Sequence, residues 1–134
     1  MLRVFLLISA VLTLSACAAK YAPSNDGMWS DKPGYIAIQV DSSTYRVAFS
    51  GQNMTLENTD RYAFYRAAEL TLEKGFDYFV VLQNGLDERG LDAWNTIRMF
   101  KGPLPETALD SFDAREVVKY MAPYIQRGDE GANK

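Results

Sequence analysis

Residues 35–50 read YIAIQVDSSTYRVAFS, and apolar and polar side chains alternate twice along this stretch. In the first run, Ile36, Ile38 and Val40 share one face. In the second run, Tyr45, Val47 and Phe49 share one face. Strict alternation is typical of a half-buried strand, and Asp41-Ser42-Ser43 supplies the residues of a turn. The stretch therefore predicts a β-hairpin in which Tyr45, Val47 and Phe49 are buried while Thr44 and Arg46 are largely exposed.

The pattern then changes to a helical period. Apolar side chains recur three and four residues apart over residues 56–74. Thr55 precedes this run as a candidate N-cap, and Gly75 follows it as a residue that can adopt the left-handed conformation. We expect one helix over residues 56–74.

Two more strands and a second helix are expected after it. Residues 76–82 (FDYFVVL) are apolar on both sides after Asp77, which is typical of a central strand, and Asn84-Gly85 ends it. Residues 87–95 form a charged loop, and residues 96–101 form a strand. The last helix is capped by Ser111 or Asp110 and closed by Pro123. Its expected apolar face consists of Ala114, Val117, Val118 and Met121.

The expected order is thus β-β-α-β-β-α. It predicts a two-layer α+β domain over residues 35–125, with two helices on one face of a four-stranded mixed sheet. Residues 126–134 form a polar tail.

The N-terminus has the features of an export signal. The first three residues carry one positive charge, and residues 4–14 (VFLLISAVLTL) are uncharged and almost wholly apolar. This run is shorter than the about 20 residues that a membrane-spanning helix needs, and it fits the apolar part of a signal peptide. Leu14-Ser15-Ala16-Cys17 resembles the lipobox of bacterial lipoproteins, in which the cysteine thiol takes a diacylglyceryl group. We expect a signal peptide over residues 1–16, cleavage between Ala16 and Cys17, and lipid attachment at Cys17.

Ordinary secretion is the alternative, because Ala16-Cys17-Ala18 also has the small-x-small form that a conventional signal peptidase cuts. The cysteine count favours lipidation, since Cys17 is the only cysteine and has no intramolecular disulfide partner. Two or more acyl chains anchor a protein stably, and three are expected on such a lipoprotein. By resemblance to lipoprotein sorting, Ala18 indicates the outer membrane, with the domain facing the periplasm; the inner membrane is the alternative location.

Residues 17–34 predict a flexible tether, because they lack periodicity and are rich in Pro, Gly, Ser, Asn and Asp. Such a coil spans roughly 20–25 Å on average. Tyr21 and Trp29 could lie at the lipid headgroups, where amphipathic rings are favoured. Packing of Trp29 on the domain is the alternative.

Composition excludes several functions. The net charge of −3 argues against a nucleic-acid partner, which needs a basic surface. The chain has no histidine, so it has no imidazole base for a nucleophile and no imidazole ligand for zinc. Cys17, once acylated, offers no thiolate. We therefore expect no catalytic residues, no metal and no cofactor.

Arg66 and Glu69 are the candidate ligand or partner contacts. Glu69 and Glu73 share one face of the first predicted helix, where paired carboxylates could bind a hard metal or act as acid and base. An exposed ion pair between Arg66 and Glu69 on a solvated face is the favoured interpretation. Asp87-Glu88 with Asp92 lacks the spacing of an EF-hand, so a solvated loop is favoured there as well.

Three segments carry a resemblance to a known family. Residues 65–73 (YRAAELTLE) with residues 75–79 (GFDYF), residues 45–51 (YRVAFSG), and residues 101–103 (KGP) with residues 112–117 (FDAREV) resemble a family of small proteobacterial lipoproteins named from Caulobacter. The likeness covers most of residues 34–125. It implies an envelope lipoprotein and supplies no activity.

These observations favour a membrane-anchored, non-enzymatic lipoprotein whose domain serves structure or binds an envelope protein. A binder of a small ligand or peptidoglycan fragment, using the groove beside the first helix, is the alternative. A hydrolase ranks below both.

Overall fold

The computed structural model describes residues 21–24, 33–51, 54–87, 92–104, 106 and 110–126. The predicted signal peptide, the cleavage site and Cys17 lie outside these residues. Among the described residues, no helix is both long enough and apolar enough to cross a membrane.

In the described part of the chain, five antiparallel strands form one sheet with the spatial order β1-β2-β4-β3-β5. The strands are β1 (Gly34–Gln39), β2 (Thr44–Ser50), β3 (Tyr78–Leu86), β4 (Asp92–Phe100) and β5 (Ser111–Asp113). Helix α1 (Leu56–Glu73) connects β2 to β3, and β4 occupies the place between these two strands. The strands joined by the helix therefore make no hydrogen bonds to each other.

The prediction of a four-stranded mixed sheet is wrong. The observed order is β-β-α-β-β-β-α and every pairing is antiparallel, although the broader α+β description is consistent with it. The strand that was not predicted, β5, has three residues, and this is too short for alternation to show. The predicted caps of the last helix also fail, because Asp113 caps α2 (Ala114–Met121) and Ser111 lies in β5.

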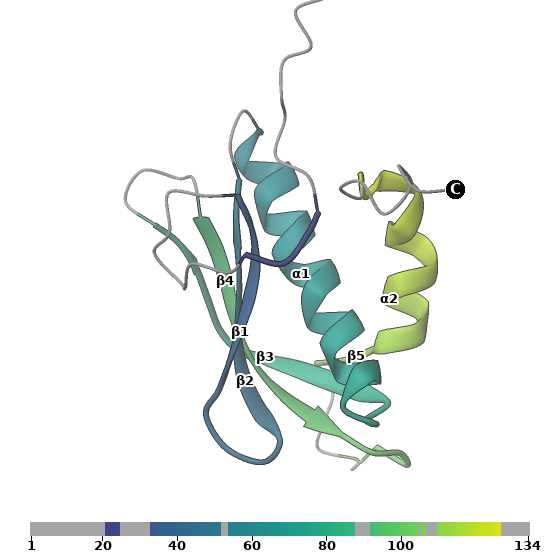
Figure 1. Ribbon diagram of the computed structural model, residues 1–134. Helices are drawn as coiled ribbons and strands as arrows, with labels where there is room; N and C mark the ends of the chain where they lie inside the picture. Colours follow the sequence, from purple (N-terminus) through teal and green to yellow (C-terminus); the bar gives the residue numbers. More distant parts are fainter. Residues whose placement is uncertain are drawn as a thin grey trace, which may run out of the picture.

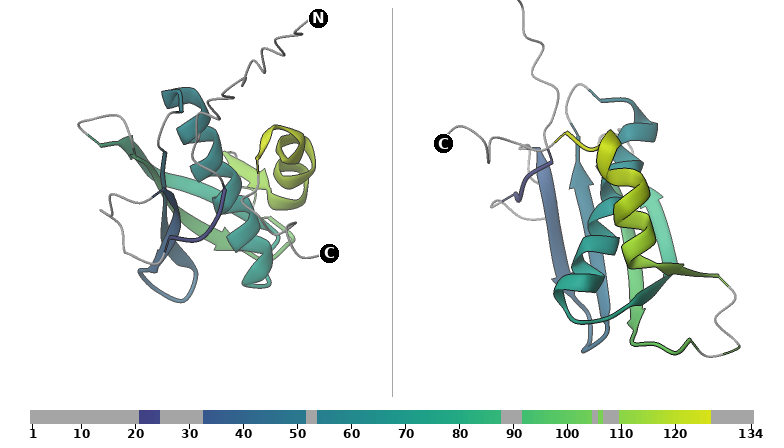
Figure 2. Two further views of the ribbon diagram at one scale, coloured as in Figure 1. Left: turned by 45° about the horizontal axis from the view of Figure 1, so that its top comes forward. Right: turned by 90° about the vertical axis from the view of Figure 1, so that its right-hand side faces the viewer.

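Both helices lie on the same face of the sheet (Figure 1), and the view from the side shows them as one layer in front of it (Figure 2). Thr55 caps α1 as predicted, since its hydroxyl oxygen accepts a hydrogen bond from the N–H of Asn58 at 3.2 Å. The helix ends at Glu73, and Gly75 adopts a φ of +82°. A short 3₁₀ helix, η1 (Ala122–Tyr124), contains Pro123 and follows α2.

The core lies between the sheet and the helices. The prediction for β2 is confirmed on this side, where Tyr45, Val47 and Phe49 are all buried. Fully buried side chains from the other elements include Tyr65 and Thr71 of α1, Phe79 of β3, and Ile97 and Met99 of β4.

The opposite face of the sheet is partly covered by Trp94. This ring lies across from Gly85, where an added Cβ atom would come within 2.7 Å of it. The guanidinium of Arg46 lies 4.7 Å from the ring centroid, and its Nε donates to Thr96 at 3.1 Å. Arg46 is therefore half-buried, and Thr44 is buried. The prediction that both are largely exposed is wrong, because β2 is an interior strand and side chains of the adjacent β4, such as Trp94, flank its outer face.

Two strand boundaries also differ from those predicted. β3 continues through Asn84-Gly85 to Leu86, with a bulge between Val81 and Gln83, so glycine does not end it. β4 begins at Asp92, within the stretch predicted as a charged loop. Pairing between the two long strands extends both beyond the limits that local sequence indicates.

Residues 21–24, predicted as part of a flexible tether, pack on the domain. Pro23 bridges Tyr35 of β1 in parallel orientation, and the N–H of Ser24 donates to the C=O of Tyr35 at 2.8 Å. Tyr21 is only 3 % exposed. The placement of Tyr21 at lipid headgroups is therefore wrong, and Trp29 lies outside the described residues.

Candidate functional site

Arg66, Glu69 and Glu73 meet on the face of α1 that points toward β1 and the N-terminal segment. Arg66 forms a bidentate ion pair with Glu73, with Nη1 at 2.6 Å from Oε1 and Nη2 at 2.9 Å from Oε2. Its Nη1 also lies 3.4 Å from Oε2 of Glu69. Spacings of three and seven residues bring these side chains onto one helical face. The predicted Arg66–Glu69 pair exists, but it is not on a solvated face, because the two side chains are 10 % and 15 % exposed.

Two tyrosines from outside the helix complete this cluster. The hydroxyl of Tyr21 donates a hydrogen bond to Oε2 of Glu69. The guanidinium of Arg66 lies 4.3 Å from the ring centroid of Tyr35, and the rings of Tyr21 and Tyr35 are 4.7 Å apart. The cluster thus joins the N-terminal segment, β1 and α1.

The charges of the cluster are held in place by their partners. Burial by itself lowers the pKa of Arg66, but the hydrogen bond and the Coulombic attraction of Glu73 outweigh it and raise that pKa above its ordinary value. Burial, followed by the hydrogen bond to Glu69, raises the pKa of the Tyr21 hydroxyl. Arg66 therefore stays cationic and Tyr21 stays a neutral hydrogen-bond donor at physiological pH.

This arrangement acts as a clamp. Both terminal nitrogens of Arg66 contact carboxylates of its own helix, and Tyr21 ties one of those carboxylates to the chain segment that follows Cys17. The contact of Arg66 and Glu69 with a ligand or partner stays a prediction. No local pattern indicates that Tyr21 or Tyr35 belongs to this cluster, because both reach it through contacts made across the fold.

Asp87 and Asp92 of the predicted charged loop contact each other where β3 ends and β4 begins. Asp87 accepts a hydrogen bond from the N–H of Asp92 at 3.1 Å, and the two close a turn between β3 and β4. Glu88 lies outside the described residues. Within the described part of the chain, no three or more Asp, Glu, Cys or His residues are grouped so that they could hold a metal ion.

A second candidate site lies along β3. The edge of this strand that points away from β4 is paired over only part of its length. β5 pairs with β3 over Tyr78–Val80, and from Val81 to Leu86 no strand of the described chain pairs with this edge. Two cavities, of about 510 and 470 Å³, follow the edge and share Asn84.

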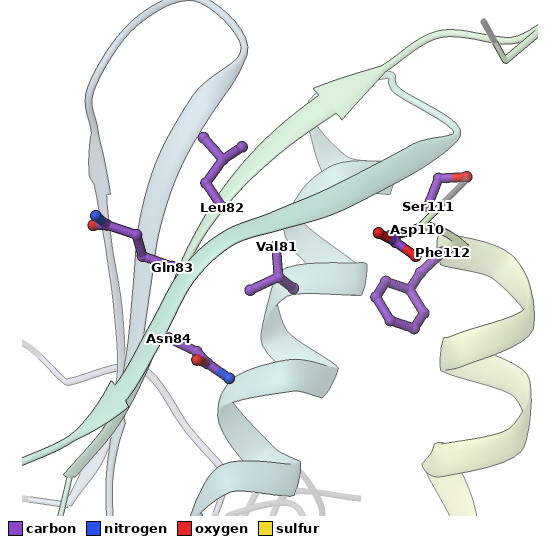
Figure 3. A pocket seen from close by; sticks show the side chains of 7 residues that line it. All are labelled: Val81, Leu82, Gln83, Asn84, Asp110, Ser111 and Phe112. Atoms are coloured by element: carbon purple, nitrogen blue, oxygen red, sulfur yellow. The ribbon is translucent and has the colours of Figure 1, made fainter. Parts of the chain in front are cut away.

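The walls of these cavities come from distant parts of the chain. Figure 3 shows Val81 and Asn84 turned toward α1, with residues 110–112 across from them. The second cavity is lined by residues 84–86 of β3 and by Leu56, Glu57 and Asp60 of α1. Phe112, Leu56 and Leu86 are 40 %, 51 % and 47 % exposed, so the groove offers apolar surface.

The charged side chains that line this groove are all acidic, although Glu57 already pairs with Arg61 at 2.9 Å. Its acidic side chains are Glu57, Asp60 and Asp110, whereas residues 81–86 (VLQNGL) carry no charge. Lysine, proline and β-bulges usually protect exposed edge strands; this edge has no lysine or proline, and its one bulge lies between Val81 and Gln83. We name Val81–Leu86 with the two adjoining cavities the β3 groove. No local sequence pattern predicts the β3 groove, because the length of β5 determines where the edge of β3 is free.

Comparisons of the chain with protein-family models, with curated proteins and with solved structures gave no match. The resemblance to the family named from Caulobacter therefore stays a prediction.

Proposed function

We propose that the chain is a lipid-anchored protein of the bacterial outer membrane, with a non-enzymatic domain that binds an extended segment of an envelope protein along the β3 groove. The anchor rests on the lipobox around Cys17. The position of Tyr21 supports it, because this buried residue lies only four residues after the cysteine that becomes the first residue on cleavage.

The free, uncharged edge of β3 carries the proposal of protein binding. An extended segment can add to an open edge through main-chain hydrogen bonds, while alternate side chains enter neighbouring pockets. β5 already occupies the first part of the same edge in this way. The acidic side chains of the groove favour a segment that alternates apolar residues with Lys or Arg.

Site-specific photo-crosslinking in intact cells tests this proposal. A photoreactive residue at Leu82 or Leu86 probes the edge, and one at Val40 is the control because Val40 is 62 % exposed on the turn between β1 and β2. We expect both edge positions to capture one envelope protein, with the crosslink mapped by mass spectrometry to an extended segment containing basic residues. Capture of the same protein from Val40, or crosslinks mapped to helical or acidic segments, would contradict the proposal.

A small-ligand site is the second candidate. A cavity of about 390 Å³ beside β1 is lined by Pro23, Ser24, residues 35–38 and Arg66. Nε of Arg66 and the hydroxyl of Ser24 are buried there with no hydrogen-bond partner within the described structure. Buried polar groups usually find partners, which favours an occupant that supplies them. A rise in melting temperature with muramyl dipeptide, lost in Ser24→Ala, would support this candidate; no rise would rule out that fragment.

A further inference from the structure

Backbone and side-chain hydrogen bonds fix Tyr21 on the domain. Its N–H donates to the C=O of Gln126 at 2.8 Å, and the N–H of Gln126 donates to the hydroxyl of Tyr62 at 2.8 Å. The clamp holds the side chain of Tyr21 from the other side, through Glu69. The chain is therefore tied to the domain four residues after Cys17.

Covalent geometry then limits how far the domain can lie from the lipid. Four residues span at most about 14 Å when fully extended. This distance is roughly half the length of α1, whose 18 residues extend over about 27 Å. If Cys17 is acylated, as the proposed function requires, the domain cannot move away from the bilayer as it could on a tether that ended at residue 34.

The end of the domain near Tyr21 and Gln126 has a surface suited to lipid headgroups. Tyr120, near the end of α2, and Tyr124, in η1, are each 66 % exposed. Nζ of Lys119 lies 5.8 Å from the ring centroid of Tyr120, and the guanidinium of Arg61 lies 5.6 Å from that of Tyr124. Exposed tyrosines are favoured at the membrane interface, and Lys119 is attracted to its phosphates, whereas Arg61 already pairs with Glu57 at 2.9 Å.

The opposite end of the domain is the turn between β1 and β2. β1 begins at Gly34, beside the N-terminal segment, and its six residues extend about 20 Å away from it. Figure 1 shows this turn at the bottom of the view, with η1 and the first turn of α1 at the top. Val40 marks the turn and is 62 % exposed.

From these observations we infer that the anchored protein rests directly on the bilayer. Tyr120 and Tyr124 lie among the lipid headgroups, and the turn between β1 and β2 points away from the membrane. This inference rests on the proposed lipid anchor and adds an orientation to it.

Fluorescence quenching of the purified lipoprotein in vesicles tests the orientation. The vesicles contain phosphatidylethanolamine and phosphatidylglycerol, with a fraction of lipid carrying a nitroxide on the headgroup. Because acylated Cys17 offers no thiol, Tyr124→Cys and Val40→Cys each provide a single site for a bimane label, and the two positions have similar exposure. We expect quenching several-fold stronger at position 124 than at position 40. Equal quenching at the two positions would overturn the inference.

Two further measurements separate the causes of a negative result. A flexible Gly-Ser insertion between Ala19 and Lys20 should leave the domain folded and reduce the difference between the two labels; an unchanged difference would contradict the role of the short link. The mass of the Cys17 peptide is measured on the same samples. With the acyl chains present and quenching equal, the orientation alone fails, whereas absence of the acyl chains overturns the anchor and the orientation together.

Discussion

The hydroxyl of Tyr21 donates a hydrogen bond to Oε2 of Glu69, 48 residues further along the chain. The bond joins the segment after the predicted lipidation site to the middle of α1. Glu69 in turn contacts Arg66, whose guanidinium lies over the ring of Tyr35 in β1. Glu69, one of the two residues singled out from the sequence as a candidate contact, therefore helps to hold the N-terminal segment on the domain.

Tyr21→Phe tests this clamp. The variant keeps the packed ring but removes the donor to a largely buried carboxylate, so we expect it to lower the free energy of unfolding by about 1–3 kcal/mol. Denaturant unfolding measures the change, and cleavage near residue 21 by a protease should become faster. Tyr120→Phe is the matched control, since this ring is 66 % exposed and the variant should stay within about 0.5 kcal/mol of wild type. A loss no larger than that of the control would contradict the clamp.

The two faces of β2 are tested by a pair of alanine variants. Phe49 is fully buried, and Phe49→Ala should lower the free energy of unfolding by about 3–5 kcal/mol. From sequence alone Arg46→Ala would be nearly neutral. The stacking of Arg46 on Trp94 and its bond to Thr96 raise the expected loss to about 1–2 kcal/mol. Equal losses at the two positions, measured by denaturant unfolding, would mean that the strand faces are wrongly assigned.

Gly85→Ala tests how Trp94 packs on the face of the sheet opposite the helices. A Cβ atom at this position would lie 2.7 Å from the ring of Trp94, so Gly85→Ala must displace the indole. We expect a loss of about 1–3 kcal/mol, typical of overpacking, together with a shift in tryptophan fluorescence. Gln83→Ala on the same strand is exposed and should leave both unchanged. Unaltered fluorescence in Gly85→Ala would show that Trp94 does not pack against residue 85.

Acid sensitivity is expected at Asp77. A hydrogen bond from the N–H of Gly102, followed by one from Arg115, lowers the pKa of the Asp77 carboxyl below its ordinary value. In the unfolded chain the pKa of an Asp carboxyl lies near pH 4. A carboxyl whose pKa is lower in the folded state stabilises the fold fully above that pH. This contribution is lost as the pH falls through the folded-state pKa. Wild type should therefore lose more stability than Asp77→Asn between about pH 5 and pH 3. Parallel stability curves for the two proteins would contradict this assignment.

Local patterns predicted the elements that have enough residues to show a period. The alternation around Val47 and the helical spacing after Thr55 identify β2 and α1 because side chains on one face must all be buried together. β5 could not be predicted, since its three residues become a strand only by pairing with β3. The same dependence on pairing explains why β3 passes through Asn84-Gly85.

The candidate site was only partly accessible from sequence. Spacing on a helix placed Arg66 beside Glu69, because neighbours on a helical face follow from residue numbers alone. Tyr21 and Tyr35 reach the same cluster through the tertiary fold, and no local pattern reports such contacts. The β3 groove likewise depends on where β5 ends and how α1 crosses the sheet.

The mass of the mature N-terminus shows whether the protein is cleaved before Cys17 and lipidated there. The protein is extracted from membranes with detergent and digested, and the N-terminal peptide is measured by mass spectrometry, with Cys17→Ser as the control. We predict that the wild-type peptide begins at Cys17 and carries a diacylglyceryl group with a further acyl chain, and that Cys17→Ser remains an uncleaved, unlipidated precursor. A wild-type peptide that begins after Ala18, or one that begins at Cys17 without lipid, would contradict the account.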